Sequence, residues 1–358
     1  MVHMPGAGPI GSGRRRGLPR HTSLPRRWRD LNGRLWWYAL RRGFDTFLRQ
    51  QCVDMAAALT FYAVLALVPA FMVLVGLLGL IGMDDSTVEF LLDVLHAVAP
   101  AGVADALRGP LYGFTAISLA PVPLAALVVV TLGTASLYQG ALARAMNRVY
   151  EVMEGRPLLL LPPLQYLTTA LLILGCCAMM VTLIASPAIM EAAGGAIGLD
   201  RAAVQLWNTL RWPVLIALAM VVVAVVYRTA PNSRPEGVRW LIPGAVLAVA
   251  LGVGASWALT FYLARLYPRL DLNYGTLSGL IVLLMWLWVC NLALVIGAVL
   301  NAELARARRL AAGLPAEDDQ LTPPIDIRRS VGFTARRHML VREGARHRRA
   351  AEEERRRG

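Results

Sequence analysis

Residues 51–70 have the sequence QCVDMAAALTFYAVLALVPA, and this stretch decides the fold class. After Asp54 the run is almost entirely apolar, and it continues to residue 80 with Pro69 inside it. A helix of roughly 20 apolar residues is long enough to cross the hydrocarbon core of a membrane. The chain therefore places a carboxylate at the edge of a membrane-spanning helix and a helix-breaking residue within it.

Five further apolar stretches of similar length follow. Of the 358 residues, 57% are hydrophobic and 16% are charged, whereas soluble domains carry about 25% charged residues. The sequence predicts an all-α polytopic membrane protein with six transmembrane helices. Their predicted ranges are 57–80, 117–137, 164–190, 207–227, 241–263 and 276–300. The fourth has the weakest signal, because Arg211 lies near its start.

Basic residues are distributed unevenly between the loops. All 36 are arginine, and 31 of them lie in the two terminal segments or in the loops that follow the second and fourth helices. Positively charged loops stay on the cytoplasmic side. This predicts a multi-pass protein of the bacterial plasma membrane with both termini in the cytoplasm. Because the chain contains no lysine, a Walker-type nucleotide-binding loop is excluded.

The segments outside the spans differ in composition. Residues 1–33 are rich in glycine, proline and arginine, so we expect disorder there, and we expect it again in the basic tail 311–358. Residues 34–50 predict an amphipathic helix that either lies in the membrane interface or packs on the bundle, which comprises residues 51–310. The external loop predicts a second amphipathic helix at 87–98, which starts with a capping box.

Polar residues inside or beside apolar spans are the candidate functional positions, because the membrane makes them costly. They form a candidate polar pathway or structural cluster. Each also has a structural explanation: a carboxylate at a helix start, a proline kink, an amide that joins two helices, or an interfacial tyrosine. The candidates are Asp54, Tyr62, Pro69, Asn147, Arg156, Tyr227, Asn232, Tyr274, Asn291, Asn301 and Glu303.

Several of these positions carry a family resemblance. The stretch 54–70 resembles the first-helix signature of the YihY/virulence factor BrkB membrane proteins, once labelled ribonuclease BN. ARAMNRVYEVMEGRP (143–157), YRTAPNSR (227–234) and the stretch 274–303 are similar to later motifs of that family, in the same order. The resemblance covers about residues 44–310. It implies six helices in a bacterial plasma membrane, and it departs from the family pattern where Val299 replaces a glutamate.

Three functions compete. We expect transport or handling of an envelope or lipid-like substrate, and a non-catalytic envelope-integrity or scaffold protein is the alternative. The nuclease of the old label needs clustered metal ligands, which the five scattered histidines do not predict. We therefore expect no enzyme, no cofactor and no metal. Expected partners are anionic lipid headgroups at the basic tails, without nucleic acid, and a homo-oligomer or another membrane protein is left open.

One specific prediction concerns the carboxylate at the start of the first predicted helix. Asp54, Arg156 and Asn232 all fall at the predicted cytoplasmic boundary. An isolated buried charge costs several kcal/mol, so a carboxylate buried there needs a cationic or hydrogen-bonding partner. We predict that the three side chains form one polar cluster, and otherwise that Asp54 only caps its helix.

Overall fold

A computed structural model of the chain describes residues 25, 30–80, 89, 92–93, 108–109, 112, 121–157, 161–185, 201–233, 237–274, 277–317 and 324–357. Two predictions lie essentially outside these residues: the disordered start of the chain and the external helix at 87–98. The secondary structure of the described residues is helical apart from one isolated bridge between Ser233 and Pro324. The predicted all-α fold is confirmed.

Apolar composition gives helices close to the predicted spans. Five described helices are long and apolar enough to cross a membrane, and α2 with α1 forms a sixth candidate across a bend of 63°. The helices are α1 (Gly33–Arg49), α2 (Cys52–Leu80), α5 (Pro121–Val149), α6 (Leu161–Ile184), α8 (Arg201–Thr229), α9 (Ile242–Tyr274), α10 (Leu277–Ala311) and α11 (Arg328–Arg357), with a short 3-10 helix η2 (Val238–Trp240).

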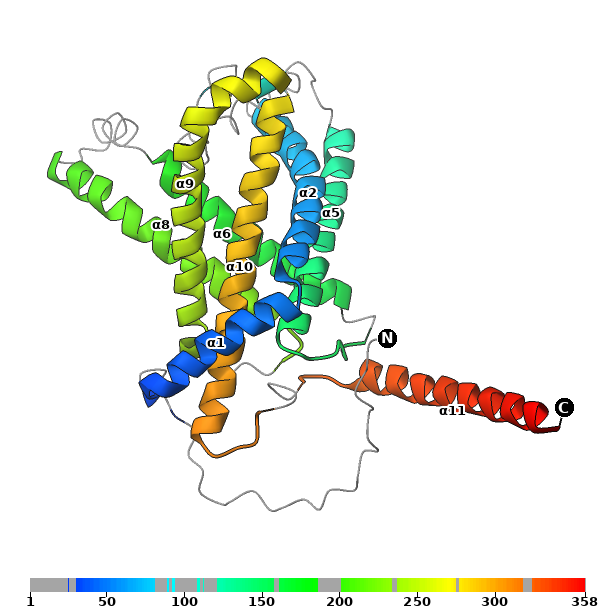
Figure 1. The fold of residues 1–358 in the computed structure, drawn as a ribbon. Helices are drawn as coiled ribbons and strands as arrows, with labels where there is room; N and C mark the ends of the chain where they lie inside the picture. The colour runs from blue at the N-terminus through cyan, green and yellow to red at the C-terminus, as the bar shows by residue number, and fades with distance from the viewer. Residues whose placement is uncertain are drawn as a thin grey trace.

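Helix α10 is the centre of the bundle (Figure 1). It packs along α9, against α2, and at one end against α1, while α2 in turn packs along α5. Helices α6 and α8 pair with each other at the side and touch the rest through α5 and α9. Helices α1 and α11 both lie at the same end of the bundle, which we call the basic end.

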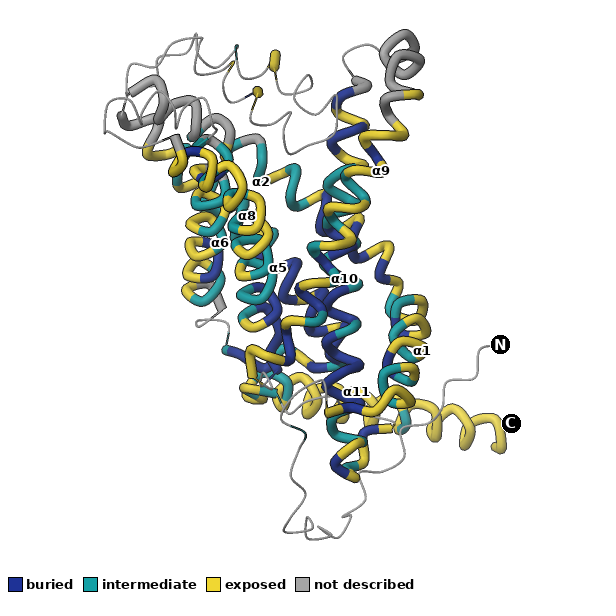
Figure 2. The backbone as a smooth tube through the Cα atoms, turned by 90° about the vertical axis from the view of Figure 1, so that its left-hand side faces the viewer, coloured by how far each residue is buried: buried dark blue, intermediate teal, exposed yellow. Residues whose placement is uncertain are grey.

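Burial is concentrated near the basic end. Figure 2 shows the buried residues gathered in the lower parts of α5 and α10, whereas α6 and α8 are mostly intermediate or exposed. The main core joins α2, α5, α9 and α10 through residues such as Leu59, Met146, Ala245 and Val295. The most deeply buried part of the protein is therefore the end at which α1 lies.

Helix α1 packs on the bundle and also keeps an apolar outer face. Its start is capped by the Asn32 side chain, which accepts a hydrogen bond from the backbone N–H of Leu35 at 2.9 Å. Ala39 and Thr46 are buried against α10, while Trp37 and Phe44 are exposed. The two placements predicted for this segment are thus compatible, because one face contacts protein and another is free to contact lipid.

The structure describes a helix in the C-terminal tail, the segment for which disorder was predicted. Residues 328–357 form α11, which projects from the basic end with no buried residue. Alanine, arginine and glutamate favour helix even without an apolar stripe, and Arg348 pairs with Glu352 one turn away at 3.0 Å. The prediction of disorder followed from the missing apolar periodicity and did not include this helix propensity.

Candidate functional site

The carboxylate of Glu303 is the centre of a buried ionic network at the basic end. It lies on α10 with a relative exposure of 1%. The Thr46 hydroxyl donates to it at 2.9 Å, and the Arg42 guanidinium lies 3.4 Å away, so both α1 partners reach it. Glu303 therefore ties α1 to the end of α10.

Arg306 extends this network to the α5 end. It is fully buried and donates to Glu303 at 3.2 Å and to Glu151 at 3.1 Å. Its third contact is the Ala316 carbonyl at 2.6 Å. Arg49 of α1 approaches the other oxygen of Glu151 at 3.7 Å. One guanidinium thus joins two carboxylates and the chain after α10.

The network lies beside two backbone positions that are unusual for their residue type. Gln51, between α1 and α2, has φ of 55°, and Glu151, just after α5, has φ of 53°. Non-glycine residues in this left-handed region carry about 1–2 kcal/mol of strain. At α5 the strained residue closes a Schellman-type end, in which Val152 donates to Asn147. The strain places the Glu151 carboxylate within reach of Arg306.

A second polar network joins α5, the loop after it and the end of α8. The Arg156 guanidinium donates to both oxygens of Glu154 at 2.8 Å and to the Ala230 carbonyl at 3.0 Å. The Asn147 amide donates to Glu154 at 2.8 Å, and its oxygen accepts the backbone N–H of Asn232 at 2.6 Å. Arg156 and Asn232 are therefore linked indirectly, through Asn147, which was among the candidates, and Glu154, which was not.

Glu154 is ionised more readily than an ordinary glutamate. Burial raises the pKa of its carboxyl, but the hydrogen bonds and charge of Arg156, together with Asn147, lower it further, and the net pKa is lowered. A pair of this kind holds its charge at neutral pH. Arg156 and Glu154 thus form a charged clamp on the carbonyls that end α8.

The chain after residue 323 docks beside this clamp, on Asn232 and Gly155. The Asn232 side chain donates to the Asp326 carbonyl at 2.8 Å and accepts from the Asp326 N–H at 3.2 Å. Arg329 donates its backbone N–H to the Gly155 carbonyl at 3.0 Å. A Cβ atom at Gly155 would meet the Asp326 carbonyl oxygen at 1.8 Å, so only glycine permits this approach. These backbone contacts fix the start of α11.

The structure does not place Asp54 in the predicted cluster. Its side chain is exposed at the start of α2, and no partner for its carboxylate lies among the described residues. Glu154 is the carboxylate that pairs with Arg156 instead, because it lies only two residues away on the same loop. The remaining explanation for Asp54 is its favourable place in the first turn of a helix.

In the middle of the bundle Asn291 joins three helices. Tyr138 of α5 donates to the Asn291 oxygen at 2.8 Å, and the Asn291 amide lies 3.3 Å from the Thr60 hydroxyl of α2. The same amide donates to the Leu287 carbonyl at 2.9 Å. Its polar atoms are all used by protein partners, which is the arrangement of an interhelical contact.

The crossing of α9 and α10 depends on two glycines. A Cβ at Gly244 would lie 2.2 Å from the Gly297 carbonyl, and a Cβ at Gly297 would meet the Tyr227 hydroxyl. Asn301 accepts from the Gly244 N–H at 2.8 Å, and Tyr227 donates to the Leu294 carbonyl at 2.7 Å. Small residues let the two backbones approach, and the polar side chains then bond across the contact.

The other candidates have simpler surroundings. Tyr62 packs against the main core, with the Arg144 guanidinium 5.9 Å from its ring centroid. Pro69 lies within α2 and is half-buried. The side chain of Tyr274 lies outside the described residues.

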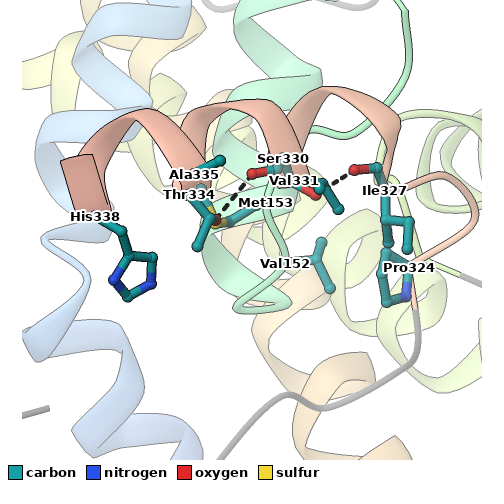
Figure 3. A pocket seen from close by; sticks show the side chains of 9 residues that line it. All are labelled: Val152, Met153, Pro324, Ile327, Ser330, Val331, Thr334, Ala335 and His338. Atoms are coloured by element: carbon teal, nitrogen blue, oxygen red, sulfur yellow. Dashed lines mark hydrogen bonds between the residues drawn. The ribbon is translucent and has the colours of Figure 1, made fainter. Parts of the chain in front are cut away.

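A groove of about 460 Å³ runs beneath the start of α11 (Figure 3). Val152 and Met153 form one side, and Val331, Ala335 and His338 of α11 form the other. Its lining is mostly apolar. Among the described residues, no group of three or more His, Cys, Asp or Glu side chains could hold a metal ion.

Several partners of the candidate residues were not identified from the sequence. Arg306 follows Glu303 by three residues, so its proximity was available from helical spacing. Thr46 and Glu151 had no such signal, because they are distant in sequence and approach only when α1 folds against α10.

Comparison with known proteins agrees with this membrane architecture. The family model described as "Virulence factor BrkB" matches residues 44–321, which is most of the chain. The chain belongs to this family. No solved structure matches the chain.

Individual relatives of the BrkB-family chain are distant. A UPF0761 membrane protein of Stenotrophomonas maltophilia is 28% identical over 73% of this chain and 59% of its own length. Another UPF0761 membrane protein, from Alkalilimnicola ehrlichii, is 28% identical over 75% of this chain and 59% of its own length. A "putative ribonuclease-like protein" of Bacillus subtilis is 24% identical over 51% of this chain and 66% of its own length. The chain therefore spans about three-fifths to two-thirds of the length of these relatives.

Proposed function

We propose that this BrkB-family protein transports or handles an envelope or lipid-like substrate in a bacterial plasma membrane, with the basic end in the cytoplasm and α1 as a movable cover. The supporting observation is Glu303, a fully buried carboxylate near the end of a membrane-spanning helix. Two of its partners, Arg42 and Thr46, belong to α1. Ionisable groups in such helices are costly and mark functional sites by default.

The bend between α1 and α2 has the features of a hinge about which α1 could move. The two helices meet at 63°, and the left-handed Gln51 lies at the bend. Strained backbone positions cluster at elements that switch between conformations. Release of Glu303 from its α1 partners would free α1 to swing about this hinge while α10 stays packed against α9 and α2.

A scaffold without transport is the second candidate. It is supported by Asn291, Tyr227 and Asn301, whose polar atoms bond to neighbouring helices. Under this alternative the ionic network only fastens α1, and no movement of α1 is needed.

A reversible cross-link between α1 and α10 separates these functions. A Cβ at Gly43 would lie 3.6 Å from Val299 Cγ1, so the side chains of Gly43→Cys and Val299→Cys are close enough for a cross-link to be tested once the four native cysteines are replaced. The chain is reconstituted in liposomes containing a headgroup-labelled phospholipid, and bleaching by an impermeant reductant reports its movement between leaflets. The proposal expects movement that oxidation stops and thiol reductant restores.

The controls are the two single-cysteine variants, which oxidation should leave active. Movement that continues in the oxidised double variant would exclude α1 as the cover. Movement equal to that of protein-free liposomes, in both redox states, would favour the scaffold.

A further inference from the structure

At the contact between α5 and α6, two side chains that carry hydrogen-bond donors lie close to the backbone of a glycine. Gly140 of α5 has no side chain, and a Cβ there would lie 3.2 Å from the Gln165 Nε2 atom and 3.4 Å from the Arg144 Nη1 atom. Gln165 comes from α6, and Arg144 lies one turn along α5. An amide donor and a guanidinium thus lie around the same spot.

Two buried side-chain oxygens on the same two helices have no hydrogen-bond partner among the described residues. They are the Gln139 Oε1 and the Thr169 Oγ1, on side chains with relative exposures of 2% and 3%. Gln139 immediately precedes Gly140, and Thr169 follows Gln165 by one turn on the same helix face. Buried polar atoms are almost always satisfied, so an orphaned pair indicates a bound water or ligand.

The residues around this polar contact are partly exposed on the surface of the protein. Arg144 is exposed, and so are Tyr166 and Leu167, which follow Gln165 on α6. The exposed apolar neighbours are those of a helix surface that contacts lipid in a membrane protein. A ligand that reaches Arg144 along this surface comes from the bilayer.

We propose that Arg144, Gln165, Gln139 and Thr169 form a binding site for the headgroup of an anionic phospholipid of the phosphatidylglycerol type. The phosphate accepts hydrogen bonds from the Arg144 guanidinium and the Gln165 amide, and guanidinium–phosphate contacts are among the strongest hydrogen bonds. A headgroup hydroxyl donates to the Gln139 oxygen. Choline carries no hydroxyl donor, so phosphatidylcholine leaves the Gln139 oxygen without a partner, and its positive charge is repelled by the Arg144 guanidinium that holds the phosphate.

The simpler explanation for Arg144 is an arginine that extends to the membrane interface over the Tyr62 ring. Arg148 provides a matched control, because it is exposed on the same helix one turn further on and does not approach Gly140. The site does not depend on α1 being a cover, since a lipid that is bound permanently and never transported fits it equally well.

Native mass spectrometry of the full-length purified protein tests the site. The protein is titrated with phosphatidylglycerol, phosphatidylcholine and soluble glycerol 3-phosphate. We expect preferential retention of phosphatidylglycerol, a loss of about tenfold in Arg144→Gln, and less than a twofold change in Arg148→Gln. Gly140→Ala should also weaken retention without a change of charge, whereas Gly133→Ala should not, since a Cβ at Gly133 meets nothing within 4 Å.

Three results would overturn the proposal. Equal losses in Arg144→Gln and Arg148→Gln would show general attraction to a basic surface. Unchanged retention in both Arg144→Gln and Gly140→Ala would place the lipid elsewhere. Binding of glycerol 3-phosphate as strong as that of the lipid would identify a site for a soluble phosphate. Thermal melting of each variant tests whether it is folded. We expect all of them to fold, because Arg144 is exposed and a methyl group at Gly140 meets only the movable ends of the Gln165 and Arg144 side chains.

Discussion

Helices α10 and α8 are both apolar enough to cross a membrane, but they occupy opposite positions in the bundle. In α10, 33% of the most apolar segment is buried, whereas in α8 the figure is 6%. The difference follows from what each helix carries besides apolar residues. Helix α10 has Asn291, Gly297, Asn301, Glu303 and Arg306, and each of them touches a neighbouring helix or the chain beyond α10.

This comparison separates two properties that hydropathy combines. Apolar length decides that a helix enters the membrane, because its backbone bonds are satisfied internally. It does not decide which helix is central, because lipid tails are as apolar as leucine side chains. Glycines and polar groups make that choice, and α8 is fixed chiefly at its ends by such contacts.

The largest effect is expected from the ionic network of α10. Arg306→Leu leaves Glu303 and Glu151 without their shared cation, and breaking a buried ion pair from one side costs about 3–5 kcal/mol. Unfolding in detergent titrated with denaturant measures the loss. Arg342→Leu, on the exposed surface of α11, is the control and should change stability little. A loss below about 1 kcal/mol in Arg306→Leu would contradict the central role of this network.

The second effect concerns the close crossing of α9 and α10. Gly244→Ala forces a methyl group against the Gly297 carbonyl, and overpacking of this kind costs about 1–3 kcal/mol. Gly252→Ala on the same helix meets nothing within 4 Å and should be neutral or stabilising by up to about 1 kcal/mol. The two melting temperatures should therefore move in opposite directions or differ clearly. Equal shifts would mean that the helices do not approach through Gly244.

The third effect is that of the amide in the middle of α10. Asn291→Leu removes two interhelical contacts, each worth roughly 0.6 kcal/mol in a membrane protein, so a loss of about 1 kcal/mol is expected. Val221→Ala on the exposed face of α8 should have almost no effect under the same denaturant titration. If Val221→Ala costs as much as Asn291→Leu, the contrast between the two helices fails.

The smallest effect concerns the clamp at the end of α8. Glu154→Gln should cost about 0.5–1 kcal/mol at neutral pH, because the charge in the hydrogen bonds to Arg156 is lost. The folded pKa of Glu154 is lowered, so its contribution is fully present above the ordinary glutamate pKa and is lost as pH falls through the folded pKa.

Stability curves of wild type and Glu154→Gln, recorded from neutral to acidic pH, test this sign. The gap between them should stay constant at neutral pH and close only in the acid range. A gap that widens on acidification would contradict the lowered pKa.

The sequence was sufficient for the architecture. Six apolar stretches of membrane-spanning length predicted the helices. Several ends of the described helices lie within a few residues of the predicted ends. Asn291 and Asn301 were identified as candidates because an amide inside a membrane span needs a partner. The family followed from motifs that stand in the same order along the chain.

The partners of these residues were decided only by tertiary structure. Asp54 and Glu154 are both carboxylates near the basic end, and the short separation of Glu154 from Arg156 in the sequence did not by itself show that their side chains meet. The turn between α5 and α6 folds Glu154 back onto Arg156 and leaves Asp54 on an exposed face of α2.

Local sequence thus determined which segments are helical and apolar. Helix propensity and the free energy of transferring a side chain from water to lipid are both properties of single residues, so they can be summed along the chain. Local sequence could not determine that Thr46 bonds Glu303 across 257 residues, or that Gly155 must lack a side chain for the tail to dock. Those facts depend on the angles at which helices cross, which are set by packing of the whole bundle.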